Sequence, residues 1–221
     1  MRRMSRTHER IARWHALSGL LISSFTALHL MNHAAAFGGP VAWAAFRALL
    51  RRIYQVPAIE ILVLGLPILF NVASGIWLAA QPRTASPMDG IRPLRRRLHR
   101  ASGIVLVCLV LFHALSTRGA ALIYRIDPDF YYIATMLAGA RGIAWWGFYA
   151  LLVTAAAYHV ANGLFTLLDD AGTFPGPRAR AAGAAALILV GTTLMLAGML
   201  GLFSFGGVTY PRPSVETLPL D

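Results

Sequence analysis

Long runs of apolar residues recur along the chain, and short polar segments rich in arginine separate them. A helix needs about 20 mainly apolar residues to cross a hydrocarbon core of about 30 Å. Five runs meet this length, at about 14–37, 57–80, 98–118, 143–168 and 181–205. The pattern predicts an all-α membrane protein with five transmembrane helices, in which residues 1–221 form a single helical-bundle domain.

A shorter amphipathic pattern lies between the first two runs. Residues 40–54 combine apolar positions with arginines at helical spacing, which predicts a short helix on the outer surface. Trp43 within it is typical of the aromatic residues that anchor a membrane protein at the interface. The fifth run carries no ligand-type side chain, and the near-heptad spacing of Gly183, Gly191 and Gly198 predicts that it packs against the other helices.

Composition and charge narrow the class of protein. Hydrophobic residues make up 57% of the chain, charged residues make up 13%, and the mean hydropathy is +0.60, which excludes a water-soluble globular domain. The net charge of +11 could indicate nucleic acid, but the arginines flank the apolar runs, so no nucleic-acid partner is predicted.

The arginines are distributed unequally between the two sides of the membrane. Thirteen lie at the N-terminus and in or beside the loops at about 81–97 and 169–180, against seven on the other side. By the positive-inside rule we expect a multi-pass protein of the bacterial cytoplasmic membrane, with its N-terminus in the cytoplasm and its C-terminus outside.

One segment occurs twice, each time at the start of an apolar run. Residues 13–19 (RWHALSG) recur as residues 97–103 (RLHRASG), and each copy is followed ten residues later by a histidine, His29 or His113. Imidazole is costly in hydrocarbon and usually faces the interior of a bundle with a partner. The two copies therefore predict a pair of ligands that hold a group between the helices.

A second segment is echoed in the same order. Residues 70–77 (FNVASGIW) resemble residues 158–165 (YHVANGLF), and the echo aligns Asn71 with His159. Together the two echoes predict an internal two-fold repeat, in which helices one and two correspond to helices three and four. These four helices are expected to form the bundle around the bound group.

The spacing from the charged ends predicts two levels inside the bundle. His29 and His113 each lie sixteen residues beyond the first arginine of their segment, which places them about 24 Å above the inner side of the membrane. Asn71 and His159 lie lower, about 15–18 Å above the same side. Two facing imidazoles without a cysteine or carboxylate suit axial ligation of a planar macrocycle such as haem better than zinc, which prefers three or four protein ligands.

Glycines accompany both levels. Gly19 and Gly103 lie ten residues before the upper histidines, and Gly75 and Gly163 lie one turn beyond the lower pair. Because glycine has no side chain, it lets a flat ring approach the helix. The alternative is that these glycines only tighten helix packing, as is common in membranes.

These residues resemble a known family, the five-helix cytochrome b membrane anchor subunits of succinate dehydrogenases and fumarate reductases. The resemblance runs from about residue 10 to 205 and is carried by Arg13-Trp14-His15 with Ser18-Gly19, by His29-Leu30, by Glu60-Ile61-Leu62 with Leu66-Pro67-Ile68-Leu69-Phe70, by Gly103 with His113, and by His159 with Asn162-Gly163-Leu164. In that family, helices one and three bind an outer haem b, and helices two and four bind an inner one. The resemblance implies that His29 and His113 ligate the outer iron and that His159 is one ligand of the inner iron.

The chain departs from the family pattern at one ligand. Asn71 stands where the family's second helix carries its histidine, and an amide is a poor ligand for haem iron. Three outcomes stay open: the inner haem is absent, it is five-coordinate on His159, or a residue that the sequence does not identify binds its other face. We expect only the outer haem to have two histidine ligands.

Other polar residues are assigned to the cofactor region. His15 and His99 lie fourteen residues below the upper histidines, where they could bind haem propionates or line a quinone site, or instead contact headgroups or a partner subunit. Ser18 and Ser102, one turn away, are grouped with the cofactor-binding residues. His33, one turn above the first upper histidine, is the fallback ligand.

Carboxylates are nearly absent from the apolar runs, so Glu60 near the outer end of the second run stands out. It could relay protons to an outer quinone site, or it could pair with Arg51 or Arg52 at a helix end. Asp127 in the outer loop is expected to be solvated. Asp169 marks either a contact with a partner subunit or the end of the fourth helix.

The resemblance implies a membrane anchor that carries electrons and has no dicarboxylate active site of its own, so no catalytic residue is assigned. Its cofactor would be haem b. Its partners would be the iron–sulfur and flavoprotein subunits of the same complex, membrane lipid, and a quinone that we expect to be menaquinone. Two alternatives stay open: a cytochrome b anchor of another quinone-linked dehydrogenase, and a haem-free membrane anchor or transporter.

Overall fold

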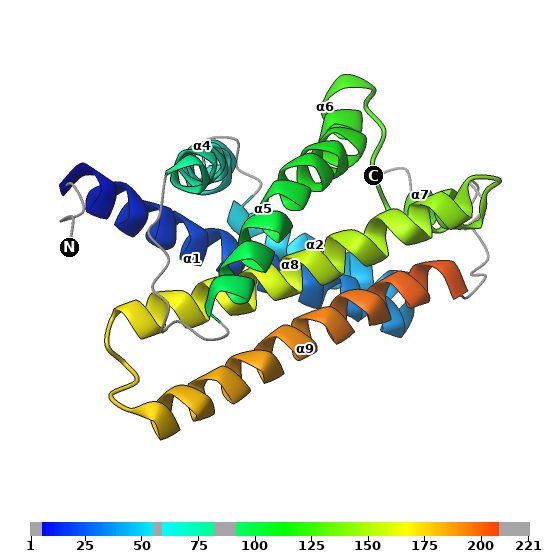
Figure 1. Cartoon of the computed structure of the whole chain (residues 1–221). Helices are drawn as coiled ribbons and strands as arrows, with labels where there is room; N and C mark the ends of the chain where they lie inside the picture. Colours follow the sequence, from blue (N-terminus) through cyan, green and yellow to red (C-terminus); the bar gives the residue numbers. More distant parts are fainter. Residues whose placement is uncertain (1–5, 55–58, 82–91, 208–221) are drawn as a thin grey trace, which may run out of the picture.

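Nearly every residue that the structure describes is helical, and no strand occurs among them (Figure 1). The structure is a computed structural model and describes residues 6–54, 59–81 and 92–207. Its α-helices are α1 (Arg6–Ala34), α2 (Gly39–Tyr54), α4 (Leu66–Ala80), α5 (Arg92–Ala114), α6 (Ala120–Ile123), α7 (Phe130–Ala138), α8 (Gly142–Asp170) and α9 (Pro177–Gly207), joined by a 3₁₀ turn η1 (Ala35–Gly38) and by the π-helical segments η2 (Glu60–Gly65) and η3 (Leu115–Gly119).

Five helical stretches in the described part of the chain are long and apolar enough to cross a membrane: Arg6–Arg52, Glu60–Ala80, Leu94–Ile123, Gly142–Asp170 and Pro177–Gly207. The prediction of an all-α protein with five spans is therefore confirmed. The internal repeat and the single-domain boundary stay predictions, and most of the expected inner loop at 81–97 lies outside the described residues.

The long helices pack against one another in pairs. Helix α8 contacts α5 and α9, helix α1 contacts α4 and α9, and α8 and α9 run side by side in Figure 1. Gly198 of α9 allows a close approach, because a side-chain carbon there would lie 3.1 Å from Leu30 of α1 and against Val153 of α8. The fifth span therefore packs on the first and fourth spans.

A turn after α1 folds α2 back over one end of the bundle. Gly39 begins α2 with a φ of 88°, a left-handed value that favours glycine. Trp43 of α2 is only 3% exposed, and its ring lies 5.7 Å from Phe205 of α9 and 6.2 Å from Phe130 of α7. The helix predicted at 40–54 is present, but the prediction that Trp43 anchors the protein at the interface is wrong, because α7 and α9 bury its ring.

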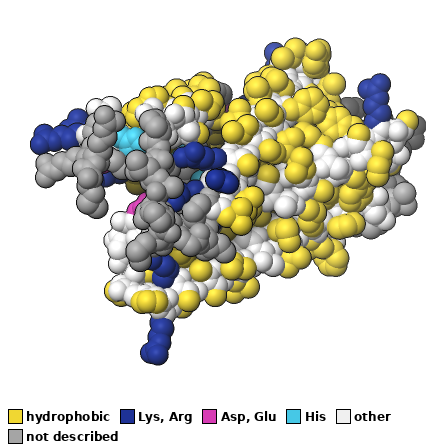
Figure 2. Space-filling model, viewed as in Figure 1, with side chains coloured by type: hydrophobic (Ala, Val, Ile, Leu, Met, Phe, Trp, Pro, Cys, Tyr) yellow, Lys and Arg dark blue, Asp and Glu magenta, His cyan; other side chains and the backbone are white. Residues whose placement is uncertain are grey.

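The surface along the spans is apolar. Leu69 of α4 and Ile104 of α5 are 67% and 60% exposed. Figure 2 shows hydrophobic side chains over most of the visible face, while arginines gather toward its ends. Such a surface suits contact with lipid chains, with the charged side chains left at the membrane boundaries.

The two π-helical segments, η2 and η3, lie at the same end of the molecule. Segment η2 begins the second span, η3 follows α5 near the end of the third, and Glu60 of η2 contacts Arg118 of η3. π-Helical turns are rare and frequently occur at functional sites. The two π-helical segments therefore make this end of the bundle a candidate functional region.

Candidate functional site

Three histidines, His15 of α1, His99 of α5 and His159 of α8, form an inner histidine cluster, and Asn71 of α4 lies beside it. The side chain of Asn71 is directed at α1: its Nδ2 donates to the carbonyl oxygen of His15 over 2.9 Å and to Ser18 Oγ over 3.0 Å. A side-chain carbon at position 19, where the chain has glycine, would lie 3.3 Å from the same nitrogen. The amide of Asn71 therefore ties the second span to the first.

His159 makes the corresponding contacts in the other half of the bundle. Its Nδ1 lies 3.2 Å from the carbonyl oxygen of His99 and 3.1 Å from Ser102 Oγ. A side-chain carbon at Gly103 would lie 3.0 Å from Cε1 of His159. The rings of His99 and His159 also stack, with centroids 4.0 Å apart and planes inclined by 7°.

Glycines make room for the remaining imidazoles of this cluster. A side-chain carbon at Gly75 would lie 3.1 Å from Cε1 of His15, and one at Gly163 would lie 3.3 Å from Cε1 of His99. Real Cβ atoms seldom approach a neighbour so closely, so a larger residue would displace the rings. Four glycines predicted from the repeat thus each lie against a histidine or asparagine side chain.

An outer histidine cluster brings together His29, His33 and His113. The Nε2 atoms of His29 and His33 lie 3.1 Å apart, and the ring centroids of His29 and His113 lie 5.9 Å apart at an interplanar angle of 64°. Within the described residues, Nδ1 of His113 is buried and has no hydrogen-bond partner. A buried polar nitrogen without a partner is costly, so this ring has capacity for a further interaction.

Glu60 and Arg118 form an ion pair between η2 and η3. Arg118 donates through Nε to Oε1 over 2.7 Å and through Nη2 to Oε2 over 2.6 Å. The side chains are 24% exposed for Glu60 and 34% for Arg118. The expected pairing of Glu60 with Arg51 or Arg52 is therefore wrong. Sequence reasoning missed Arg118, although a charge at the end of the third apolar run, opposite a carboxylate in the second, was the available signal.

Asp127, expected to be solvated, is half exposed and paired with arginines of α2. Arg47 contacts both carboxylate oxygens, and Nη2 of Arg51 lies 3.2 Å from Oδ1. Burial acts to raise the pKa of Asp127, but hydrogen bonds and charge from Arg47 and Arg51 outweigh it and lower the pKa from its ordinary 3.8. The loop before α7 is thereby tied to α2.

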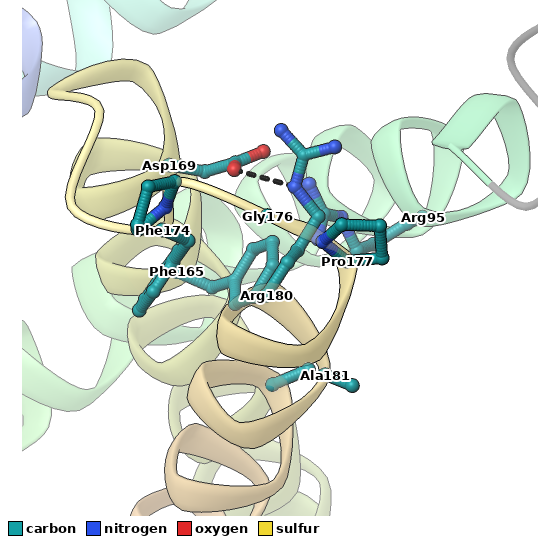
Figure 3. A pocket seen from close by; sticks show the side chains of 10 residues that line it. Arg95, Phe165, Asp169, Phe174, Gly176, Pro177, Arg180 and Ala181 are labelled. Carbon is teal, nitrogen blue, oxygen red and sulfur yellow. Dashed lines mark hydrogen bonds and ion pairs between the residues drawn. The ribbon is translucent and has the colours of Figure 1, made fainter.

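A cavity of about 510 Å³ lies where α8 ends and α9 begins (Figure 3). Asp169 at the end of α8 accepts a hydrogen bond from Arg180 Nε over 2.8 Å, and the guanidinium of Arg95 lies 4.2 Å above the ring of Phe165. Figure 3 shows both arginines on the same side of this cavity. Asp169 therefore has a partner within the chain, at the boundary of the fourth helix.

Among the described residues, no group of three or more His, Cys, Asp or Glu side chains is arranged to hold a metal ion. Helices of membrane length whose imidazoles meet in the interior define the class of this protein as an integral membrane helical bundle with two interior histidine clusters.

The comparisons with known proteins agree with this class. Residues 96–199 match the family described as succinate dehydrogenase/fumarate reductase transmembrane subunit. The chain is also 26% identical over 199 residues to the succinate dehydrogenase cytochrome b558 subunit of Bacillus subtilis (strain 168), a match that covers 87% of this chain and 95% of that protein. No solved structure matches the chain significantly. Both matches agree with the resemblance noted in the sequence, to the transmembrane subunits of succinate dehydrogenases and fumarate reductases.

Proposed function

We propose that this chain binds haem b and carries electrons between an iron–sulfur subunit and a membrane quinone, as the membrane anchor of a succinate:quinone oxidoreductase. The observation that supports haem binding best is the outer histidine cluster. The ring of His29 on α1 and the ring of His113 on α5 have centroids 5.9 Å apart. Paired imidazoles of this kind suit the two axial positions of a haem iron.

In this proposal His29 and His113 are the outer ligands, and His159 is one ligand of an inner haem. When bound, haem supplies one-electron transfer that no amino-acid side chain in the chain provides. The carbonyl of His99 and the hydroxyl of Ser102 hold Nδ1 of His159, which orients the ring and leaves Nε2 for the iron. The apolar spans exclude water and provide a low dielectric around the cofactors.

Partners and orientation follow from the proposed family role. The N-terminus would be cytoplasmic and the C-terminus outside in a bacterial cytoplasmic membrane, with the iron–sulfur and flavoprotein subunits on the inner face and menaquinone as the quinone. Glu60 is the carboxylate that we propose for proton exchange at the outer end. Because Arg118 holds both of its oxygens, that exchange requires the ion pair to open.

A reduced-minus-oxidised absorption spectrum with haem quantitation, recorded on the purified complex, tests the proposal. The wild-type complex should show b-type haem and contain a flavoprotein and an iron–sulfur subunit. His29→Ala and His113→Ala should each remove the outer haem signal, whereas His8→Ala, outside both clusters, should retain it. A complex without haem would overturn the proposal, and a nickel or molybdenum partner would instead favour the anchor of another dehydrogenase.

A further inference from the structure

We propose that His15 of α1 supplies the second axial ligand of the inner haem, opposite His159, in the place that Asn71 leaves without a ligand. The inference rests on the proposed function, since it presupposes that the chain binds haem b. It replaces the expectation that only the outer site has two histidine ligands. In this arrangement the inner ligands come from α1 and α8 instead of α4 and α8.

The hydrogen bonds around His15 assign its ring proton. Ser74 Oγ donates to the carbonyl oxygen of Phe70 over 2.6 Å, so its single proton is already used. Nδ1 of His15 lies 2.9 Å from the same Oγ and must then be the donor. The proton therefore sits on Nδ1, which leaves the lone pair of Nε2 available for a metal.

The ring of His159 is held in the same way. The hydroxyl of Ser102 donates its proton to the carbonyl oxygen of His99, so Ser102 Oγ can only accept from His159. Nδ1 of His159 therefore donates, either to the carbonyl oxygen of His99 at 3.2 Å or to Ser102 Oγ at 3.1 Å. A histidine that binds a metal through one nitrogen usually donates its other N–H to such a partner. Within the described residues, neither His15 nor His159 has a hydrogen bond at Nε2.

His15 also lies beside Asn71, the position of the second span that lacks a histidine. Asn71 bonds the carbonyl of His15, so the two residues share a level, and the His15 ring packs against Gly75, one turn along α4. Helices α1 and α8 are in direct contact, which brings the helix that carries His15 onto the helix that carries His159. The imidazole of α1 thus replaces the one that α4 lacks.

His99 cannot serve as the opposite ligand in this packing. Its ring is stacked face to face on His159, 4.0 Å away and nearly parallel. Two axial ligands must direct ring nitrogens at one metal from opposite sides, which stacked faces do not allow. His99 is instead a neighbour of the ligand, with its ring packed on that of His159.

The test compares His15→Ala with His8→Ala, a histidine of the same helix outside both clusters, in the full complex, by haem quantitation and by electron paramagnetic resonance of the low-spin haems. The wild type should contain two low-spin haems per chain, and His8→Ala should keep both. His15→Ala should lose half of the low-spin signal, either as a lost haem or as a high-spin one that added imidazole converts back. The outer haem should stay unchanged, which shows that the variant has folded.

A second variant checks the assignment from the other direction. His15→Ala combined with Asn71→His restores an imidazole to the second span, and it should recover the inner low-spin signal. Two low-spin haems in His15→Ala would overturn the inference, and so would a wild type with one haem per chain. A wild type without haem would overturn the proposed function itself, which separates the two failures.

Discussion

Replacing Glu60 by glutamine is expected to weaken the association of the second and third spans by about 2 kcal/mol. Arg118 holds the carboxylate with two charge-assisted bonds of 2.7 and 2.6 Å, and the glutamine oxygen can replace only one of them. A hydrogen bond to a charged group contributes about 1.5–3 kcal/mol. Breaking a fully buried ion pair costs about 3–5 kcal/mol, and exposed fractions of 24% and 34% place this pair below that limit.

Thermal unfolding of the purified chain in detergent, followed by circular dichroism, measures the effect. About 1 kcal/mol corresponds to roughly 2–4 °C for a chain of this size, so Glu60→Gln should melt about 4–8 °C below the wild type. Asp127→Asn is the matched control, because it breaks an arginine pair whose carboxylate side chain is 56% exposed and should cost less than about 1 kcal/mol.

A double-mutant cycle isolates the ion pair from other effects of the substitution. Glu60→Gln combined with Arg118→Gln leaves no unpaired charge, so the loss should be smaller than the sum of the two single losses. The reasoning is refuted if Glu60→Gln melts with the wild type, if Asp127→Asn is equally destabilised, or if the two single losses simply add.

Three further outcomes follow from the packing and the charges. Gly103→Ala should perturb the low-spin haem spectrum, because the added carbon would lie 3.0 Å from His159, whereas Gly147→Ala, with nothing within 4 Å, should not. Trp43→Ala should lower the free energy of unfolding by about 3–5 kcal/mol in the same melting assay. Because the pKa of Asp127 is lowered, its stabilising contribution is present above the ordinary value of 3.8 and is lost as the pH falls below it, so the melting temperatures of wild type and Asp127→Asn should converge in acid.

The number and approximate extent of the spans could be predicted because apolar length is a local property of the sequence. Imidazoles in apolar runs are also visible without a structure, and the two echoed segments indicated which histidines would share a level. The π-helical segments could not be foreseen, since Glu60–Gly65 and Leu115–Gly119 carry no periodic signal that separates them from an α-helix.

The partners of side chains were harder to predict because they depend on how distant segments meet. His15 and Ser74 lie 59 positions apart and Arg118 and Glu60 lie 58 apart, so no spacing rule connects them. Trp43 was misjudged for the same reason: a tryptophan at the end of a span is typical of an interface, but here a short helix folds back and buries it. In each of these cases the contacts of the side chain are determined by tertiary packing and not by the local sequence.

The π-helical turns also make the contact between the second and third spans depend on chain length. Each turn in η2 and η3 closes its hydrogen bonds over one residue more than an α-helix does. A π-helical turn accommodates one extra residue in an α-helix, so deleting a single residue from either segment would let α-helical bonding resume while the flanking helices kept their relative orientation. Because Glu60 and Arg118 lie within these segments, their side chains would change direction relative to the flanking helices although neither had been substituted. The contact between these two side chains therefore depends on the number of residues in each segment as well as on the two residues themselves.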